Sequence, residues 1–597
     1  MSVVDLSVRH LQDDDQTVHA DFNGDIALRF LEYVRPYRSW VVGALAAIAL
    51  FVGSQVAIPL VIKSGIDRAV ESGGALYGVL VAFLAIVATN AIGGYLQELL
   101  SAGLAQRVIF DLRRAMFAHL QIVSMDVLDQ THVGRIMSRL QGDVNALQEF
   151  LESSVSAIGD FFLIIGIVVE LLLLHWQLGL LTLTVLPALI FVRALWLPRV
   201  RETFRRAKDT SSIANAALAE NINGVRTVIG ARRERLNLAL YALKAADNRD
   251  AQIRAAWAAQ ILVPAIDTLT GVAQGMIVLA GGYAVATGHI DLGVMVAFIF
   301  CVQRFFDPIA TLSQQYTVMQ RAMAGASRIF EVLDVPVTIG DAPDAIELVS
   351  GEASVELRHV TFGYRPTRPV LHDLSFRIAP HQTVALVGPT GSGKTTIAGL
   401  IKRFREVEDG QVLVTGHDVR QVTRASLGRM VGMVPQEPFL FSATILDNIR
   451  YASDASEDQV INAAKAVRAH EFIKALPDGY GTQLTQRGQN LSFGQRQLLS
   501  FARALVANPK ILILDEATAN IDSFTERDIQ AALKVLLAGR TTLIIAHRLA
   551  TIRHADLIIV LQAGRIVESG THAALVSAGG LYSRLHARSG VSFDDEH

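Results

Sequence analysis

The feature that most limits how this chain can fold is a series of six long apolar stretches, all within the first 325 of its 597 residues. They cover residues 40–62, 77–100, 155–174, 178–197, 257–286 and 292–318. Each is close to the roughly 20 apolar residues that an α-helix needs to cross the hydrocarbon core of a bilayer. From about residue 352 the pattern changes to short β-branched strands that alternate with turns and helices. We therefore expect an α-helical six-span transmembrane domain followed by an α/β domain with a mainly parallel sheet.

The connections between these stretches predict the orientation of the spans. Links near 63–76, 175–177 and 287–291 are short and carry few basic residues, whereas 101–154 and 198–256 are long and rich in arginine. Because cytoplasmic connections carry the excess of Lys and Arg, we expect both long connections and both termini in the cytoplasm. A multi-pass chain that inserts from the cytoplasm is expected in the plasma membrane, which is the inner membrane of a bacterium.

The same patterns predict the limits of the domains. Residues 26–38 place apolar side chains at helical spacing beside Arg29, Arg35 and Arg38, which is typical of a helix that lies in the membrane interface. Pro36 is expected to separate this helix from the first span. The predicted organisation is a polar tail 1–25, a transmembrane domain 26–334, a linker 335–351, an α/β domain 352–590 and a tail 591–597.

The composition argues against several classes of function. A net charge of -2 and a pI near 6.8, without a long run of one sign, give no basis for nucleic-acid binding. The single cysteine, Cys301, excludes a disulfide framework or a thiolate metal cluster within one chain. We expect Cys301 to be a small buried hydrophobic residue.

Polar side chains inside the predicted spans leave two interpretations open. A charge at the bilayer centre costs about 2.5–3.5 kcal/mol on insertion scales, so such groups normally face a partner or a wet cavity. They can line a translocation cavity, or they can lie at helix contacts or near the membrane interface. The residues are Glu98, Asp160, Glu170, Asp267, Gln303 and Arg304.

A glycine-rich segment, "GPTGSGKT", follows the predicted strand "TVALV" and opens a helix, which is the context that a phosphate-binding P-loop requires. Its glycines let backbone N–H groups turn toward phosphate oxygens, Lys394 reaches the terminal phosphates, and Thr395 offers a hydroxyl to Mg²⁺. The expected nucleotide-binding residues are Gly388, Pro389, Thr390, Gly391, Ser392, Gly393, Lys394, Thr395 and Thr396.

Two consecutive acids follow another buried strand, in "ILILDE". Such a pair alone is often a surface turn, but a P-loop upstream favours a catalytic role. We expect Asp515 to hold Mg²⁺ through water and Glu516 to polarise the water that attacks the phosphate.

The order of these motifs gives the chain a resemblance to a known family. The P-loop, "LSFGQ" at 491–495, "ILILDEAT" at 511–518 and "IIAHR" at 544–548 are similar to the motifs of the ATP-binding cassette (ABC) family. Six upstream spans with long cytoplasmic loops are similar to its exporter-type half-transporters. The resemblance covers roughly residues 26–590 and implies an ATP hydrolase coupled to transport, with ATP and Mg²⁺ as ligands.

Further site residues are implied by the resemblance alone. Tyr364 in "VTFGY" resembles the aromatic residue that stacks on adenine, and Gln436 in "MVPQEPFLF" resembles the glutamine that touches Mg²⁺ and senses the membrane domain. His547 resembles the switch histidine at the γ-phosphate, and Asp522 resembles the acid between two active sites. An exposed strand tyrosine is the alternative for Tyr364. Glu516, His547 and Gln436 are the expected catalytic residues, and Thr395, Gln436 and Asp515 the expected metal ligands.

Two cytoplasmic segments, Leu128 to Val144 and Glu220 to Glu234, resemble the coupling loops of this class; without the α/β domain they would read as solvated amphipathic helices. The matching residues of the first are Asp129, Gly134, Ser138, Arg139 and Asp143. In the C-terminal domain, "TQLTQRG" occupies the region that relays motion to these loops, but it carries Gln483 and Gln486 where acidic residues are common.

The segment "LSFGQ" resembles the signature that binds the γ-phosphate of an ATP held by the opposite subunit, through Ser492, Gly494 and Gln495. The chain carries one P-loop and one signature, so a complete site requires two chains and a dimer is expected. Phe493 stands where glycine is commoner. Substituted signatures occur in heterodimers and in active homodimers, so the sequence leaves both open.

The expected function is ATP-driven export of amphipathic drugs, lipids or peptides by alternating access. An exporter-fold importer of a metal chelate would share every ATP motif, and only the direction of transport would separate it. A nucleotide-gated channel or regulatory subunit is a rival of another class, against which Glu516 and His547 argue. A soluble ATPase is excluded by the six spans.

Overall fold

The computed structural model describes residues 24–72, 77–131, 133–349, 351–365, 368–515, 523–545 and 552–590. Within these residues the chain divides into two compact units. A helical unit holds residues 24–119 and 133–334, and a C-terminal unit holds residues 120–132 and 335–590. The segment 120–132 thus belongs to the C-terminal unit, although its neighbours in sequence belong to the helical one.

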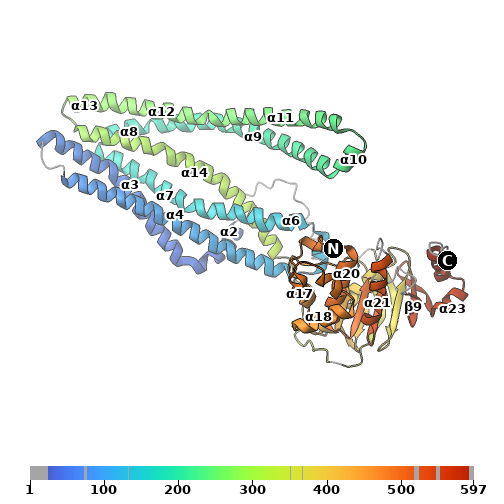
Figure 1. The fold of residues 1–597 in the computed structure, drawn as a ribbon. Helices are drawn as coiled ribbons and strands as arrows, with labels where there is room; N and C mark the ends of the chain where they lie inside the picture. The colour runs from blue at the N-terminus through green and yellow to red at the C-terminus, as the bar shows by residue number, and fades with distance from the viewer. Residues whose placement is uncertain are drawn as a thin grey trace. The chain divides into compact units, whose positions relative to one another are not determined.

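The helical unit consists of long α-helices (Figure 1). In the described part of the chain, six helical segments are long and apolar enough to cross a membrane: Gly24–Val70, Tyr77–Leu120, Val133–Leu174, Trp176–Asn223, Glu234–Ala286 and Leu292–Leu333. These segments confirm the expected six-span helical domain. Its elements are α2 (Gly24–Val34), η1 (Arg35–Tyr37), α3 (Arg38–Ser72), α4 (Tyr77–Leu120), α6 (Val133–Ser138), η2 (Arg139–Asp143), α7 (Val144–Leu174), α8 (Trp176–Leu183), α9 (Val185–Asn223), α10 (Val225–Gly230), α11 (Glu234–Gln260), α12 (Leu262–Met276), η3 (Ile277–Gly281), α13 (Gly282–Ala286) and α14 (Leu292–Leu333).

The core of this unit forms where α3, α7 and α14 pack against one another. Ile167 of α7 and Phe298 of α14 are buried in it, together with Ile48 of α3. Gly166 allows α7 to approach α3 closely, because a Cβ at this position would lie 2.7 Å from the Cγ2 atom of Val56. Small residues at such contacts are typical of helices that pack within a membrane.

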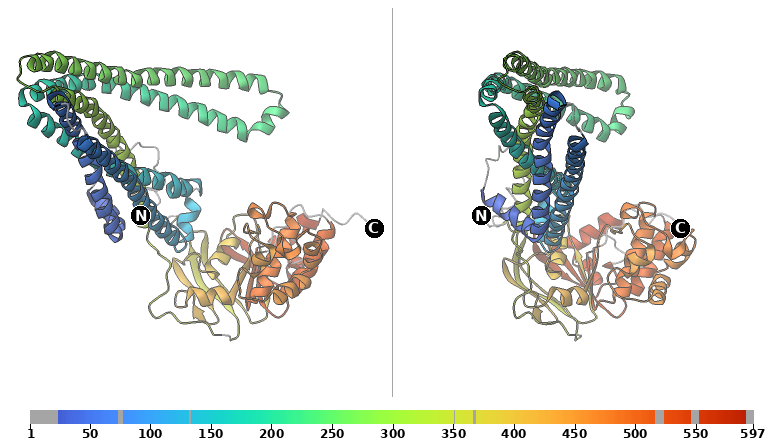
Figure 2. Two further views of the ribbon diagram at one scale, coloured as in Figure 1. Left: turned by 60° about the vertical axis from the view of Figure 1, so that its left-hand side comes forward. Right: turned by 90° about the vertical axis from the view of Figure 1, so that its left-hand side faces the viewer.

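Helices α9 and α11 lie side by side and form what we call the α9–α11 arm (Figures 1 and 2). Both views show the arm running away from α3, α4, α7 and α14 toward the short helix α10. The two helices meet through small side chains, and Ala207, Ala251 and Ala255 form a buried cluster between them. The arm thus packs mainly on itself, in contrast to the bundle around α14.

The C-terminal unit contains two sheets. The first is antiparallel, in the order β2-β1-β4-β5, and the second is six-stranded, in the order β10-β9-β3-β8-β7-β6. In the second sheet all pairs from β9 to β6 are parallel, and β10 pairs antiparallel with β9. The strands are β1 (Val355–Phe362), β2 (Leu371–Ile378), β3 (Thr383–Val387), β4 (Asp409–Val414), β5 (His417–Asp418), β6 (Val431–Val434), β7 (Ile511–Asp515), β8 (Thr541–Ile545), β9 (Leu557–Gln562) and β10 (Arg565–Gly570).

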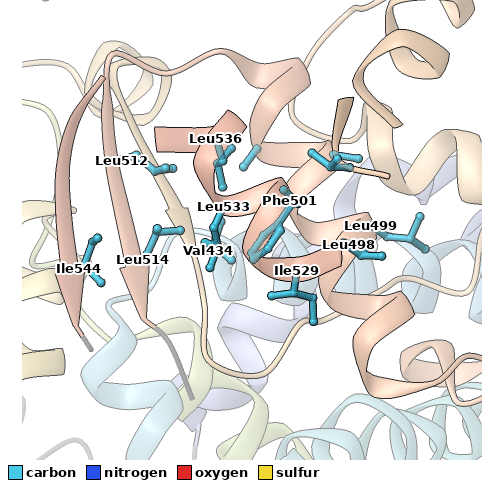
Figure 3. Close-up of a cluster of buried hydrophobic side chains, with 14 of the residues drawn as sticks. Val434, Leu498, Leu499, Phe501, Leu512, Leu514, Ile529, Leu533, Leu536 and Ile544 are labelled. Atoms are coloured by element: carbon cyan, nitrogen blue, oxygen red, sulfur yellow. The ribbon is translucent and has the colours of Figure 1, made fainter. Parts of the chain in front are cut away.

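Every residue of β7 and of β8 is buried, as expected for parallel strands covered on both faces. Helices α20 and α21 cover one face, and Figure 3 shows Phe501 of α20 and Leu533 of α21 beside Leu512 and Leu514 of β7. The helices of this unit are α5 (Met125–Gln130), α15 (Lys394–Ile401), α16 (Arg424–Met430), α17 (Ile445–Arg450), α18 (Glu457–Ala466), α19 (His470–Lys474), α20 (Phe493–Ala507), α21 (Ser523–Leu537), α23 (His572–Ser577) and α24 (Leu581–Gly590).

The strand order brings two sequence motifs to one edge of the second sheet. Strands β3 and β7 both flank β8, and Leu386 of β3 and Asp515 of β7 are both paired with Ile545. The carboxyl ends of these parallel strands therefore lie at one level. Ligands of open α/β sheets bind at this edge.

Candidate functional site

The P-loop connects β3 to α15 through a turn that only glycine accommodates at certain positions. Gly393 has a φ of 101°, in the left-handed region, and a Cβ there would lie 2.5 Å from Cδ2 of Leu371. A Cβ on Gly388 would lie 2.2 Å from the backbone oxygen of Leu561. A side chain at either position would clash, so both positions require glycine for this conformation of the loop.

Lys394 is held inside this loop. Its Nζ donates to the backbone oxygens of Gly388, at 2.8 Å, and Pro389, at 3.0 Å, and the side chain is buried. Burial lowers the pKa of Lys394, and the nearby carboxylate of Asp515 opposes this shift. The ammonium group therefore lies within the loop, with the carboxylate of Asp515 as its electrostatic neighbour.

Ser392 provides a test of whether the loop fits a phosphate. Its Oγ is buried and makes no hydrogen bond within the described residues. A buried hydroxyl without a partner is costly and calls for an explanation such as a ligand. A phosphate oxygen would accept from this hydroxyl, so the residues present fit a phosphate group.

The remaining P-loop side chains lie at the start of α15. Thr395 is exposed in the first helical turn, and Thr396 is buried. The hydroxyl of Thr396 lies 2.9 Å from the hydroxyl of Tyr364, which keeps 48% of its surface exposed. The ring of Tyr364 is nearly perpendicular to that of Phe362, with the ring centroids 5.3 Å apart. The structure thus brings Tyr364 to the P-loop helix and leaves surface on it for a ligand.

Oxygen-bearing side chains for a cation come from neighbouring strands. Asp515 is the last residue of β7 and is 7% exposed, and Gln436 is exposed two residues after β6 ends. Hydroxyl, carboxylate and carbonyl oxygens are ligands that Mg²⁺ prefers. Asp515 therefore ends β7, and Gln436 lies just beyond the end of the neighbouring parallel strand β6, at the edge of the sheet where the P-loop follows β3.

The signature segment forms the start of α20. Ser492 caps this helix: its Oγ accepts from the N–H of Gln495 at 3.2 Å, and its own N–H donates to Oε1 of Gln495 at 2.9 Å. Phe493 is the first helical residue, half-buried, with the guanidinium of Arg496 5.7 Å from its ring centroid. Gly494 is buried. The cap uses the Ser492 hydroxyl only as an acceptor, so its proton remains available to donate to a phosphate.

Three expected residues lie outside the described part of the chain. They are Glu516, Asp522 and His547. Their assigned roles remain predictions.

The first coupling segment is split between the two units. Asp129 lies in α5 of the C-terminal unit, whereas Gly134 and Ser138 lie in α6 of the helical unit. Asp143 ends the π-helical turn η2 and accepts from Nε of Arg328 on α14 at 2.9 Å. Arg139 is 3% exposed. These two charged side chains are therefore packed against α14 and are not solvated.

Arg405, which no sequence motif indicated, lies after α15 and contacts both α5 and Tyr364. Its partners in α5 lie 276 and 279 residues away in the chain, so no local spacing could have indicated the contact.

Comparisons with known proteins bear on both units. The family described as "ABC transporter" matches residues 371–519, and the family described as "ABC transporter transmembrane region" matches residues 41–309. A curated relative, the "Uncharacterized ABC transporter ATP-binding protein YknV" of Bacillus subtilis, is 37% identical over 582 residues, which cover 96% of each chain. This chain belongs to the ABC transporter family.

Other relatives of this ABC transporter carry more informative names. The "ATP-dependent lipid A-core flippase" of Syntrophus aciditrophicus is 34% identical over 566 residues, which cover 94% of each chain. A solved structure, titled "Structure of a bacterial Atm1-family ABC exporter with ATP bound", has a TM-score of 0.75 and 30% identity, and covers 94% of this chain and 99% of its own. The fold and the order of domains are therefore those of an ABC exporter half-transporter.

These findings confirm the central expectation from the sequence. The ABC transporter is a multi-pass membrane protein with a cytoplasmic nucleotide-binding domain that binds ATP, and its ATP hydrolysis drives transport. The function class is thus an exporter-type ATPase, as predicted.

The polar residues of the spans are distributed unevenly. Glu170 of α7 is 4% exposed and lies beside Cys301 of α14, which is fully buried. Asp160 is half-buried, whereas Glu98 and Asp267 are exposed on this chain. Cys301 therefore has the buried position that we expected, and Glu170 is the most deeply buried acid of the spans among the described residues.

Proposed function

We propose that this ABC transporter lies in a bacterial inner membrane and exports amphipathic, lipid-like compounds from the cytoplasm or from the inner leaflet of that membrane. We further propose that it works as a dimer of two copies of this chain. The observation that carries the dimer is the division of the ATP site within one chain. The P-loop and the helix cap of the signature are both well formed, but the chain contains only one of each. Two chains are needed to place a signature over each bound ATP.

Exposed apolar residues on the α9–α11 arm support a partner chain. The arm continues beyond the stretches that the sequence predicts to span the membrane, and exposed large apolar side chains there favour cover by another chain. Burial of this surface by a second chain would stabilise the dimer. The exposed residues are Phe204, Ile213, Leu218, Leu236, Leu240 and Leu243.

Phe493 is compatible with a homodimer, because the helix cap of the signature forms with this residue in place. As the first residue of α20 it leaves the reciprocal hydrogen bonds between Ser492 and Gln495 intact. Gly494 keeps its place in the first turn, so backbone N–H groups at the helix N-terminus remain available to a phosphate. These features favour a working signature in each copy.

The roles of the ATP-site residues follow from their positions. Lys394, Ser392 and the backbone N–H groups of the P-loop would bind the phosphates, and Tyr364 would stack on adenine. Thr395, Gln436 and Asp515 would hold Mg²⁺, which shields the phosphate charge when bound. Glu516 would orient and polarise the attacking water, and His547 would contact the γ-phosphate. Asp522 would lie between the two sites.

The proposed substrate class is supported by relatives. One relative is named a lipid A-core flippase, and another, at 34% identity over 93% of this chain, a "Putative multidrug export ATP-binding/permease protein". The first name states a lipid cargo and the second states export of drugs, which are two of the substrate classes expected from the sequence.

The test is transport by the purified chain in sealed liposomes with the nucleotide-binding domain outward. A fluorescent phospholipid, an amphipathic cationic dye and a polar sugar would be offered separately, with Mg²⁺-ATP outside. We expect ATP-dependent movement of the lipid or the dye into the lumen or its facing leaflet, and none with Glu516→Gln. ATP-dependent movement out of the lumen, or of the sugar alone, would contradict the proposal.

A further inference from the structure

Arg405 of the C-terminal unit contacts two parts of that unit, the short helix α5 and the ring of Tyr364. Its side chain is only 14% exposed, and its Nε donates to Oδ1 of Asp126 at 2.6 Å. Its second guanidinium nitrogen pairs with Asp129. Asp126 and Asp129 both lie in α5, so one planar guanidinium holds two carboxylates of the same short helix.

The same guanidinium contacts the proposed adenine platform. Its Cζ atom lies 4.8 Å from the ring centroid of Tyr364, within the range of a cation–π contact. The Tyr364 hydroxyl in turn lies 2.9 Å from the hydroxyl of Thr396 on α15. Tyr364 is therefore fixed at its hydroxyl by α15 and at its ring by Arg405.

The charge on Arg405 is maintained by its surroundings. Burial acts to lower the pKa of Arg405, but the hydrogen bond to Asp126 and the charges of Asp126, Tyr364 and Asp129 more than offset this, so its pKa is raised. A desolvated guanidinium gives a stronger cation–π contact than an exposed one. Removing its acidic partners would leave a buried charge that reorients toward water.

We propose that Arg405 is a positioning residue through which α5 sets the ring of Tyr364 for adenine binding. When α5 holds the guanidinium through Asp126 and Asp129, the ring is fixed and adenine binds a preformed surface. When α5 shifts, the guanidinium follows the acids, the ring loses its support, and the affinity for the base falls while the P-loop is unchanged. This inference rests on the proposed role of Tyr364 as the adenine platform.

The test compares a ligand that has a base with one that lacks it. Equilibrium binding of Mg²⁺-ATP and of Mg²⁺-tripolyphosphate would be measured on the full chain in lipid, in a Glu516→Gln background that prevents hydrolysis. We expect Arg405→Ala, and the double variant Asp126→Asn with Asp129→Asn, to weaken ATP binding by roughly threefold to tenfold. Tripolyphosphate binding should not change, because it uses only the P-loop.

Three further variants separate the possible outcomes. Asp528→Asn removes an acid from another ion pair of this unit, with Arg468, and should leave both affinities unchanged. Tyr364→Ala should also weaken ATP selectively; if it does not, the adenine role of Tyr364 is wrong. If Tyr364→Ala acts selectively but the Arg405 and α5 variants change nothing, or weaken both ligands equally, the positioning role of Arg405 is wrong. Arg405→Lys keeps the positive charge but loses the planar guanidinium that bonds two carboxylates. It should therefore bind ATP more tightly than Arg405→Ala but less tightly than the unmodified chain.

Discussion

At the proposed ATP site, single polar residues are buried at a cost in folding stability that binding of a ligand would offset. Ser392 buries a hydroxyl without a hydrogen bond to any described residue, and Lys394 turns its ammonium group onto two carbonyl oxygens of its own loop. Both arrangements sacrifice stability that an apolar residue would not lose. A phosphate would give the Ser392 hydroxyl a hydrogen-bond partner and the Lys394 ammonium group an opposite charge, which makes the P-loop a site prepared for its ligand.

Replacing Ser392 by alanine separates folding from ligand binding. Because the hydroxyl has no partner among the described residues, Ser392→Ala should leave the thermal midpoint of unfolding unchanged or slightly raised. Loss of a hydrogen bond to a charged phosphate, about 1.5–3 kcal/mol, should weaken ATP binding by at least about tenfold. Calorimetric unfolding and nucleotide titration of the same preparation measure both effects. A clear loss of stability would show that the hydroxyl supports the fold.

The sequence predicts the P-loop well because everything it needs is local. Glycines at fixed spacing, a preceding apolar strand and a lysine at the helix start all lie within about a dozen residues. The contacts of Arg405 could not be predicted in this way, because they depend on acids 276 and 279 residues earlier in the chain. The assigned roles of the ATP-site residues remain proposals.

Secondary-structure elements place these residues, and their ends matter most. Helix α20 begins with a reciprocal cap between Ser492 and Gln495, and α18 begins with the same cap between Ser456 and Gln459. Only the first of these caps belongs to the signature. The chain thus contains a matched pair of helix starts, one proposed to contact phosphate and one with a structural role.

Replacing the N-cap serine of α18 or of α20 by alanine should lower stability by similar amounts but should affect ATP hydrolysis differently. Losing an N-cap serine costs about 1 kcal/mol, so Ser456→Ala and Ser492→Ala should lower the unfolding free energy of the nucleotide-binding domain by similar amounts. Only Ser492→Ala should also reduce ATP hydrolysis, by about tenfold, since it removes a donor to the γ-phosphate. ATPase assays and chemical denaturation of both variants test this. Equal losses of activity would mean that Ser492 acts only as a cap.

The boundaries of the elements were less predictable than their existence. The expected span at 178–197 is divided between α8, which begins at Trp176, and α9, which continues to Asn223. Pro36 lies in a three-residue 3-10 turn between α2 and α3, and α3 begins directly after this turn at Arg38. Hydropathy reports which residues prefer lipid, but a helix continues into water as long as its backbone hydrogen bonds are satisfied.

At the scale of the whole molecule, one chain carries one P-loop and one signature segment, which we propose form half of each ATP site. Its exposed apolar residues on the α9–α11 arm and its single signature helix both favour a second copy. In that dimer, bound γ-phosphate would hold the two nucleotide-binding domains together, and hydrolysis would release them. Transport would follow because the two states differ in affinity for ATP and for its products.

The most direct test of this account is the Mg²⁺-ATPase activity of the chain purified alone in lipid, beside Glu516→Gln and beside a sample without Mg²⁺. We expect clear hydrolysis by the unmodified chain and loss of hydrolysis in both controls, because two copies would complete both sites. A folded preparation that binds ATP but does not hydrolyse it would contradict the homodimer. It would show that this chain requires a different partner with a signature segment of its own.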